Sequence, residues 1–181
     1  MSDNLSELIK KFTLLGCQVV SEDKSKGLVE LKGLTFLSIV EFGVKLLYCP
    51  LSRVLYKVIL TSPELSYEDG EKQADKIATI YGEKFQSVGE GQSIHYLGFR
   101  DDDFGIDDSY EGVSENYYYK ANEEWLISIE SEYWNDTKKE GNQIESADVG
   151  VNVITYSKDS LEAIYEKEVR RYDIEAGLQE I

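Results

Sequence analysis

Apolar residues begin at helical spacing close to the amino terminus. Leu5, Leu8, Ile9 and Phe12 lie three or four positions apart, and Gly16 is a suitable end point. This spacing predicts a short first helix.

Residues 17–61 follow a different pattern. They contain several short runs rich in Val, Leu, Ile, Phe and Tyr, separated by Lys-Gly, Phe-Gly and Cys-Pro steps. This alternation of apolar runs and turn signals predicts consecutive antiparallel strands.

A second helix is predicted after Pro63. Ser66 is followed three positions later by Asp69, as in a capping box, and the helical pattern fades between Gly82 and Gln86. Its expected apolar face consists of Tyr67, Ala74, Ile77, Ala78, Tyr81 and Phe85.

The second half of the chain is predicted to contain further strands and one more helix. We expect strands at 93–99 and 148–156, with loops at 86–92 and 135–146. A final helix is expected from Asp159 onward, because Glu162 stands three positions later in capping-box position.

The segment 125–133 alternates cleanly between apolar and polar residues. Such alternation is typical of a strand with one face buried and one face in water. The buried face would carry Trp125, Ile127, Ile129 and Tyr133, and the wet face Ser128, Glu130 and Glu132.

Strands grouped in runs, rather than alternating with helices, favour an α+β fold with a mostly antiparallel sheet. We expect a short amino-terminal helix, a central helix and a carboxy-terminal helix packed on that sheet. The length of 181 residues fits one domain over 1–181, with an acidic and partly loop-like segment at 100–116.

Net charge changes the picture most. The chain carries −16, and residues 101–136 hold 12 Asp or Glu against one Lys, which is −11 of that total. Such a field repels the phosphates of nucleic acids and anionic lipids and attracts a cationic partner.

The remaining composition indicates a cytoplasmic protein. Residues 1–9 lack the pattern of a secretory signal, and the apolar stretch at 34–47 is interrupted and too short to span a bilayer. Cys17 and Cys49 are the two cysteines of the chain, which does not suggest a disulfide framework, and we expect two reduced, partly buried thiols.

The acidic segment does not match a calcium-binding loop of the EF-hand type. An EF-hand loop that starts at Asp101 needs glycine at position 6 and glutamate at position 12. Ile106 and Gly112 occupy those positions, so the EF-hand pattern fails. A calcium- or ligand-binding module of another kind stays open as an alternative.

Catalytic and cofactor motifs are missing from the sequence. No zinc spacing, nucleophile elbow or phosphate-binding loop occurs, and we expect neither a cofactor nor a metal. The single histidine leaves one enzyme alternative, a carboxylate-dependent hydrolase that uses His95 with Asp101–Asp108.

Aromatic residues are interleaved with the carboxylates of the acidic segment. Strand alternation sends Tyr118 to the face opposite Tyr117 and Tyr119, so at least one ring should be exposed. Rings and carboxylates together are typical of a surface that binds a basic protein. The candidate partner-binding residues are Asp101, Asp102, Asp103, Phe104, Asp107, Asp108, Tyr110, Glu111, Tyr117, Tyr118, Tyr119 and Trp134. The competing interpretation is a solvated loop that keeps the chain soluble.

A small acidic α+β chain with this profile resembles the immunity proteins that bacteria make against toxins of contact-dependent inhibition and related polymorphic systems. The resemblance is carried by Asp101–Asp136 and Tyr117–Tyr119, and no diagnostic motif is matched. It implies a non-catalytic inhibitor, a monomer or weak dimer, that neutralises a cationic toxin domain, such as a nuclease.

Overall fold

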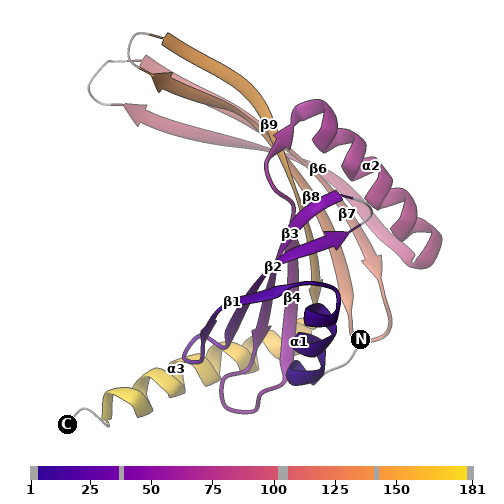
Figure 1. Ribbon diagram of the computed structural model, residues 1–181, viewed down its shortest axis with the longest axis vertical. Coiled ribbons are helices and arrows are strands. Elements are labelled where there is room, and N and C mark those ends of the chain that lie inside the picture. The colour runs from indigo at the N-terminus through magenta and orange to yellow at the C-terminus, as the bar shows by residue number, and fades with distance from the viewer. Residues whose placement is uncertain (1–3, 37–38, 102–105, 141–142, 179–181) are drawn as a thin grey trace. The chain divides into compact units, whose positions relative to one another are not determined.

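The computed structural model describes residues 4–36, 39–101, 106–140 and 143–178 (Figure 1). Side chains are described throughout these ranges except at 39–40, 92–101, 106–114, 134–140, 143–148, 173 and 175–178. The helices are α1 (Leu5–Leu14), α2 (Tyr67–Lys84) and α3 (Glu162–Leu178), with a short 3₁₀ turn, η1 (Asp159–Leu161), before α3. The strands are β1 (Gln18–Asp23), β2 (Leu28–Phe36), β3 (Ile39–Tyr48), β4 (Leu55–Thr61), β5 (Leu65–Ser66), β6 (Gln86–Asp101), β7 (Ile106–Lys120), β8 (Leu126–Glu140) and β9 (Gln143–Ser157).

The predicted fold class is confirmed. The strand pairs whose register is described are antiparallel, and three α-helices accompany the sheet in the predicted order. No helix in the described part of the chain is long and apolar enough to cross a membrane.

The chain forms two compact units. Unit 1 comprises Met1–Pro63, Lys120–Ile127 and Ile154–Ile181, and unit 2 comprises Glu64–Tyr119 and Ser128–Val153. Strands β8 and β9 contribute residues to both units.

The strands of unit 1 follow the order β1, β2, β3, β4 and then the last residues of β9. Residues that pair across neighbouring strands, such as Leu31 with Val44 and Leu46 with Val58, place their side chains in one buried layer. The buried apolar core of the unit is formed by Leu5, Leu8, Cys17, Val29, Leu31, Leu34, Phe42, Val44, Leu46, Tyr48, Cys49, Leu55, Tyr56, Val58, Leu60, Trp125, Ile127 and Ile154.

Local signals of the sequence explain where the first elements begin and end. The side chain of Asn4 caps α1 by accepting a hydrogen bond from the backbone N–H of Ser6 at 3.0 Å. Gly16, just after the end of the helix, has a φ of 94°, a conformation that favours glycine. The turn between β1 and β2 needs glycine at position 27, because its φ is 57° and a Cβ there would collide with the carbonyl oxygen of Tyr48.

Polar contacts attach α3 to unit 1. The carboxylate of Glu168 accepts hydrogen bonds from the backbone N–H groups of Leu51 and Ser52 at 2.8 and 2.9 Å. The ring of Tyr165 stacks on Tyr56 at a centroid distance of 4.9 Å. None of the described α3 side chains is fully buried, so specific polar and aromatic contacts, rather than a large apolar face, hold this helix.

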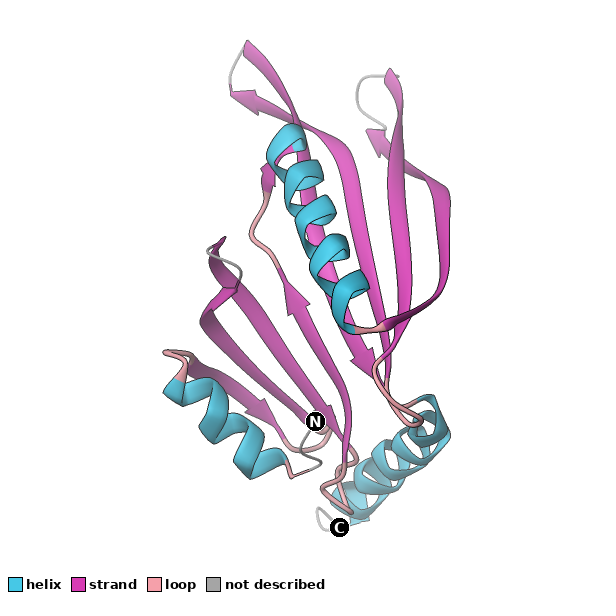
Figure 2. Ribbon diagram, turned by 90° about the vertical axis from the view of Figure 1, so that its right-hand side faces the viewer, coloured by secondary structure: helices cyan, strands magenta, loops and turns pink. Residues whose placement is uncertain are grey.

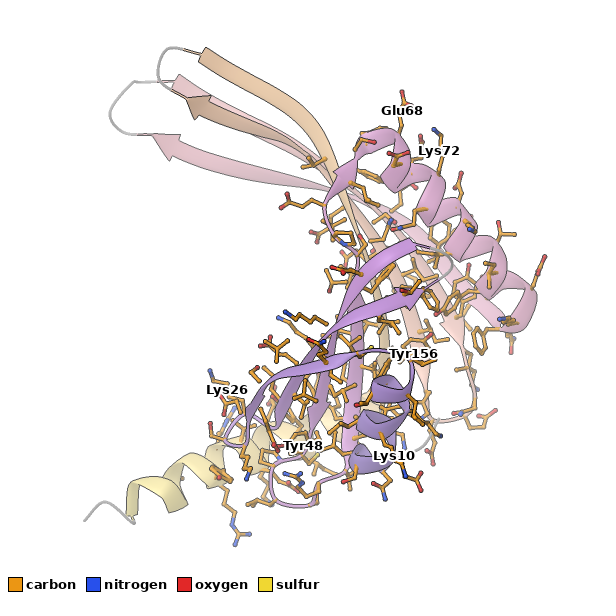
Figure 3. The ribbon with its side chains drawn as sticks, in the orientation of Figure 1. Lys10, Lys26, Tyr48, Glu68, Lys72 and Tyr156 are labelled. Carbon is orange, nitrogen blue, oxygen red and sulfur yellow. The ribbon has the colours of Figure 1, made fainter. Side chains whose placement is uncertain are left out.

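The strands of unit 2 follow the order β9, β8, β7 and β6, and β5 pairs with β9 through Leu65 and Gly150. Figure 2 shows α2 lying across one face of these strands. Ser66 caps α2 as predicted, since its hydroxyl accepts from the N–H of Asp69 at 3.2 Å. The outer side of the helix is solvated, and Glu68 and Lys72 project from it as an exposed ion pair of 3.7 Å (Figure 3).

Two predicted loops are wrong. Residues 86–92 belong to β6, and the stretch predicted as a loop at 135–146 belongs to β8 up to Glu140 and to β9 from Gln143. The segment at 100–116, expected to be partly loop-like, is strand at 100–101 and 106–116. Polar residues in these stretches lack the apolar alternation on which strand prediction depends, and pairing with neighbouring strands supplies the missing stabilisation.

Candidate functional site

The negative charge of the chain is concentrated in unit 2. This unit contains 20 Asp or Glu and 6 Lys or Arg, a net charge of −14, whereas unit 1 contains 15 and 13, a net charge of −2. The sequence located the most acidic segment, but the division into units shows that α2 and the strands next to it belong to the same acidic body.

A buried polar network fixes α2 to the sheet of unit 2. Asn152 on β9 donates from Nδ2 to the carbonyl oxygen of Gly70 at 3.1 Å and to Oε1 of Gln73 at 2.6 Å. Its Oδ1 accepts from the hydroxyl of Ser131 on β8 at 2.6 Å. Asn152, Gln73 and Ser131 are at most 5% exposed, so these hydrogen bonds replace those that the groups would make with water.

Sequence reasoning missed this network. The predicted apolar face of α2 included Tyr67, which is 44% exposed, and omitted Gly70 and Gln73, which are buried. A polar residue at helical spacing is ordinarily assigned to the solvent, and its partner on β9 lies 79 positions away in the chain. The one available signal was Asn152 itself, a polar residue within the apolar run at 149–154.

Tyr133 lies beside this network in a cradle of two glycines. A Cβ on Gly150 would lie 2.8 Å from its Cδ1 atom, and a Cβ on Gly70 would lie 3.2 Å from its Cε1 atom. The ring also meets Tyr67 at a centroid distance of 4.8 Å. Glycine at both positions therefore makes room for the aromatic ring between helix and strand.

The hydroxyl of Tyr133 is buried and makes no hydrogen bond to any residue whose side chain is described. The nearby hydroxyl of Ser131 is already committed to Asn152. Burial raises the pKa of Tyr133 to about 12; the carboxylates of Glu115 and Glu71 act in the same direction, and proximity to Ser131 partly opposes them. Tyr133 is thus a neutral core residue at physiological pH.

The three consecutive tyrosines have different environments. Tyr119 is 5% exposed, donates to the carbonyl oxygen of Ala78 at 3.0 Å and lies against the ring of Tyr81. Tyr118 is 43% exposed, and its ring lies beside Gly89, where a Cβ would be 3.8 Å from the Cδ2 atom of the ring. Tyr117 is half-buried. The predicted alternation is confirmed, and Tyr119 serves the core rather than the surface.

Tyr117 borders an acidic hollow on unit 2. The hollow has a volume of about 310 Å³ and is lined by Glu90, Gly91, Glu115, Asn116 and Tyr117; we call it the Tyr117 hollow. Burial raises the pKa of the Tyr117 hydroxyl, and the carboxylates of Glu115, Asp75 and Glu90 raise it further. Two of these carboxylates, Glu90 and Glu115, line the hollow together with the ring.

The other predicted site residues are only partly described. Asp102, Asp103 and Phe104 lie outside the described residues. The backbone places Asp101 at the end of β6, four further residues on β7 and one on β8, but their side chains lie outside the description. These five are Asp107, Asp108, Tyr110, Glu111 and Trp134. His95, the residue on which the hydrolase alternative depends, lies on β6, and its side chain is also outside the description.

Both thiols of the chain are held in the core. Cys17 and Cys49 are free, buried thiols, as predicted, and burial raises the pKa of each. Within the described residues, no three His, Cys, Asp or Glu side chains are arranged to hold a metal ion.

Neither a protein-family model nor a curated protein matches this sequence.

Proposed function

We propose that this protein is a non-catalytic binding protein that neutralises a cationic protein partner, and specifically an immunity protein for a toxin domain, with unit 2 as its binding surface. The observation that carries the proposal is the net charge of −14 on unit 2 against −2 on unit 1. A field of one sign on one body accelerates and orients the approach of an oppositely charged protein.

The Tyr117 hollow offers a position for a basic side chain of that partner. Glu90 and Glu115 would pair with a lysine or arginine, and the ring of Tyr117 would pack against it. The exposed ring of Tyr118 supplies a second rigid anchor of the kind that is enriched in interface hot spots. If the toxin is a nuclease, the carboxylates occupy the place of the substrate phosphates in its basic cleft.

The proposal predicts that a toxin domain is encoded beside this chain, and it is tested by expressing the two together in a bacterial host. The wild-type chain is expected to restore growth, and the variant with Glu90→Lys and Glu115→Lys to lose this protection. The matched control reverses Glu123 and Glu166 of unit 1, two acidic residues whose ion pairs are exposed and contribute little to stability.

Association kinetics of the purified pair give a second readout. Steering by exposed charges is screened over roughly 8 Å at physiological salt, so the association rate constant should fall steeply as salt is added. Protection that survives the reversal of Glu90, Glu115 and Asp101–Asp103 together would overturn the proposal. An unchanged association rate constant across the salt series would also overturn it.

A further inference from the structure

The first strand of unit 1 has an open edge. β1 is the terminal strand of its sheet and pairs with β2. Five of its six residues are exposed, so no element among the described residues of the unit covers it. The outward-facing backbone N–H and C=O groups of such a strand are available to a further strand.

An apolar patch adjoins this edge. It consists of Leu14, Leu15, Val19 and Val20, which are 78%, 64%, 50% and 58% exposed. Leu5 and Leu8 face the core from the first turns of α1, whereas Leu14 and Leu15 lie at its end, just before the chain turns into β1. We call these four residues the β1 patch. Its residues lie close together in the chain, unlike the scattered apolar side chains that are ordinary on a protein surface.

The surroundings of the β1 patch are basic, in contrast to the chain as a whole. Residues 10–32 contain five Lys and three Asp or Glu. All three acidic side chains are engaged within the unit. Glu22 pairs with Arg53 at 3.5 Å, Asp23 caps the turn at Ser25, and Glu30 accepts from Ser21 at 2.7 Å.

Four lysines near the β1 patch give this surface a positive electrostatic potential. Lys10, Lys11, Lys24 and Lys32 are exposed, and none of them forms an ion pair with a described residue (Lys10 is labelled in Figure 3). Lys10 and Lys11 lie on α1 one turn before the patch. Lys32 lies on β2, opposite Gln18 of β1. A ligand of this surface must therefore combine apolar side chains with negative charge.

We propose that the β1 edge and the β1 patch bind an extended acidic segment of a partner protein, which adds to the sheet as a further strand. Backbone hydrogen bonds to β1 supply affinity, alternate apolar side chains cover Val19 and Val20, and carboxylates pair with the lysines. A second copy of this chain suits the surface poorly, because it would bring its own lysines against these. The pairing of β1 with β2 also skips Val20, and a bulge of this kind disfavours self-pairing at a sheet edge.

The probe is a fluorescently labelled peptide of six residues that alternates Glu and Val and is blocked at both ends. One control peptide replaces Glu by Lys, and another carries N-methyl groups on alternate residues, which removes donors needed for strand pairing. Binding is followed by fluorescence anisotropy, and the site is mapped by amide hydrogen exchange of the intact chain.

The acidic peptide is expected to bind at least about tenfold more tightly than either control peptide, a difference of about 1.4 kcal/mol, and to protect amides of β1. Reversal of Lys10, Lys11 and Lys32 to Glu should weaken binding by a similar factor. The matched control reverses Lys72, Lys84 and Lys167, which are exposed elsewhere, and should leave binding nearly unchanged. Melting curves of both triple variants establish that they are folded.

Several results would overturn this inference. They are undetectable binding of the acidic peptide, equal binding of the N-methylated peptide, and protection of amides outside β1. Light scattering that shows a dimer abolished by Val20→Lys would assign the edge to a second copy instead. Binding to phosphatidylserine vesicles that is lost in the Lys10, Lys11 and Lys32 variant, without binding of the peptide, would assign it to a membrane surface.

Discussion

Asn152 on β9 and Gln73 on α2 form a hydrogen bond of 2.6 Å in the buried interior of unit 2. Each side chain satisfies the other at a place where water cannot reach them. Because Asn152 also binds the carbonyl oxygen of Gly70 and the hydroxyl of Ser131, one side chain sets the position of α2 on two strands.

Asn152→Ala is therefore expected to destabilise the protein by about 2–4 kcal/mol. It removes the partner of two buried side-chain groups, Oε1 of Gln73 and the hydroxyl of Ser131, and one hydrogen bond of the Gly70 carbonyl. Denaturant unfolding measures the loss, and hydrogen exchange should show faster exchange in α2. Thr79→Ala, on the exposed side of the same helix, is the control and should change stability by less than about 0.5 kcal/mol. A loss in Asn152→Ala as small as that of the control would contradict the role of the network.

Alanine substitutions at two glycines of unit 2 are expected to change stability in opposite directions. Gly150→Ala places a Cβ at 2.8 Å from the Tyr133 ring and should cost about 1–3 kcal/mol through overpacking. A Cβ on Gly82, inside α2, meets nothing within 4 Å, so Gly82→Ala should stabilise the helix by about 0.5–1 kcal/mol. Thermal melts of both variants decide the matter, and the packing argument fails if they shift in the same direction.

Glu168 is expected to make the attachment of α3 depend on pH. Burial by itself would raise the pKa of this carboxyl, but hydrogen bonds from Ser52 and Leu51 and the charge of Arg171 outweigh it, so the pKa lies below the ordinary 4.5. A lowered pKa means that the stabilisation is complete above this ordinary value, which applies to the unfolded chain, and is lost as the pH falls through the folded value.

Glu168→Gln should therefore reduce stability at neutral pH by about 1 kcal/mol, allowing for solvent screening. It should also flatten the pH dependence of stability in the acidic range. Hydrogen exchange of α3 against pH is the measurement, with Glu166→Gln on the exposed side of the helix as the control. Equal acid sensitivity of α3 exchange in the wild type and Glu168→Gln would exclude Glu168 as its cause.

At alkaline pH, stability should be lost through two buried tyrosines. Burial raises the pKa of Tyr56 to about 12, and its hydrogen bond to Glu162, at 3.0 Å, together with the charge of that carboxylate, acts in the same direction. Tyr133 reaches the same value, with burial again as the largest cause. Tyrosine in an unfolded chain ionises near pH 10.

Because both pKa values are raised on folding, the stabilisation is present below about pH 10 and is lost as the pH rises toward 12. A spectroscopic titration of tyrosinate should show one fewer tyrosine ionising near pH 12 in Tyr56→Phe than in the wild type. Tyr133→Phe should likewise remove one such group. If Tyr56→Phe removes none, the assignment is wrong.

The extent of sequence-based prediction differed between the two units. In unit 1 the apolar runs, Gly16 and the Asn4 cap are local signals, and the predicted helix and strands were found there. In unit 2 the strands β6 to β9 continue far into polar sequence, where the alternation that identifies a strand is absent. Backbone pairing with neighbouring strands extends β6 to β9 into these polar stretches. Such pairing leaves no local pattern in the sequence.

The sequence by itself determined the fold class, the presence of the first helix, the cap of the second helix at Ser66, the alternation around Trp125 and the position of the most acidic segment. These features depend on side-chain periodicity and charge, which are written along the chain. Tertiary structure alone decided that Tyr119 is buried while Tyr118 is exposed, that Glu90 and Glu115 line one hollow with Tyr117, and that Asn152 meets Gln73. Each of these relationships depends on which strands and helices become neighbours, and that is set by the packing of segments that are distant in the chain.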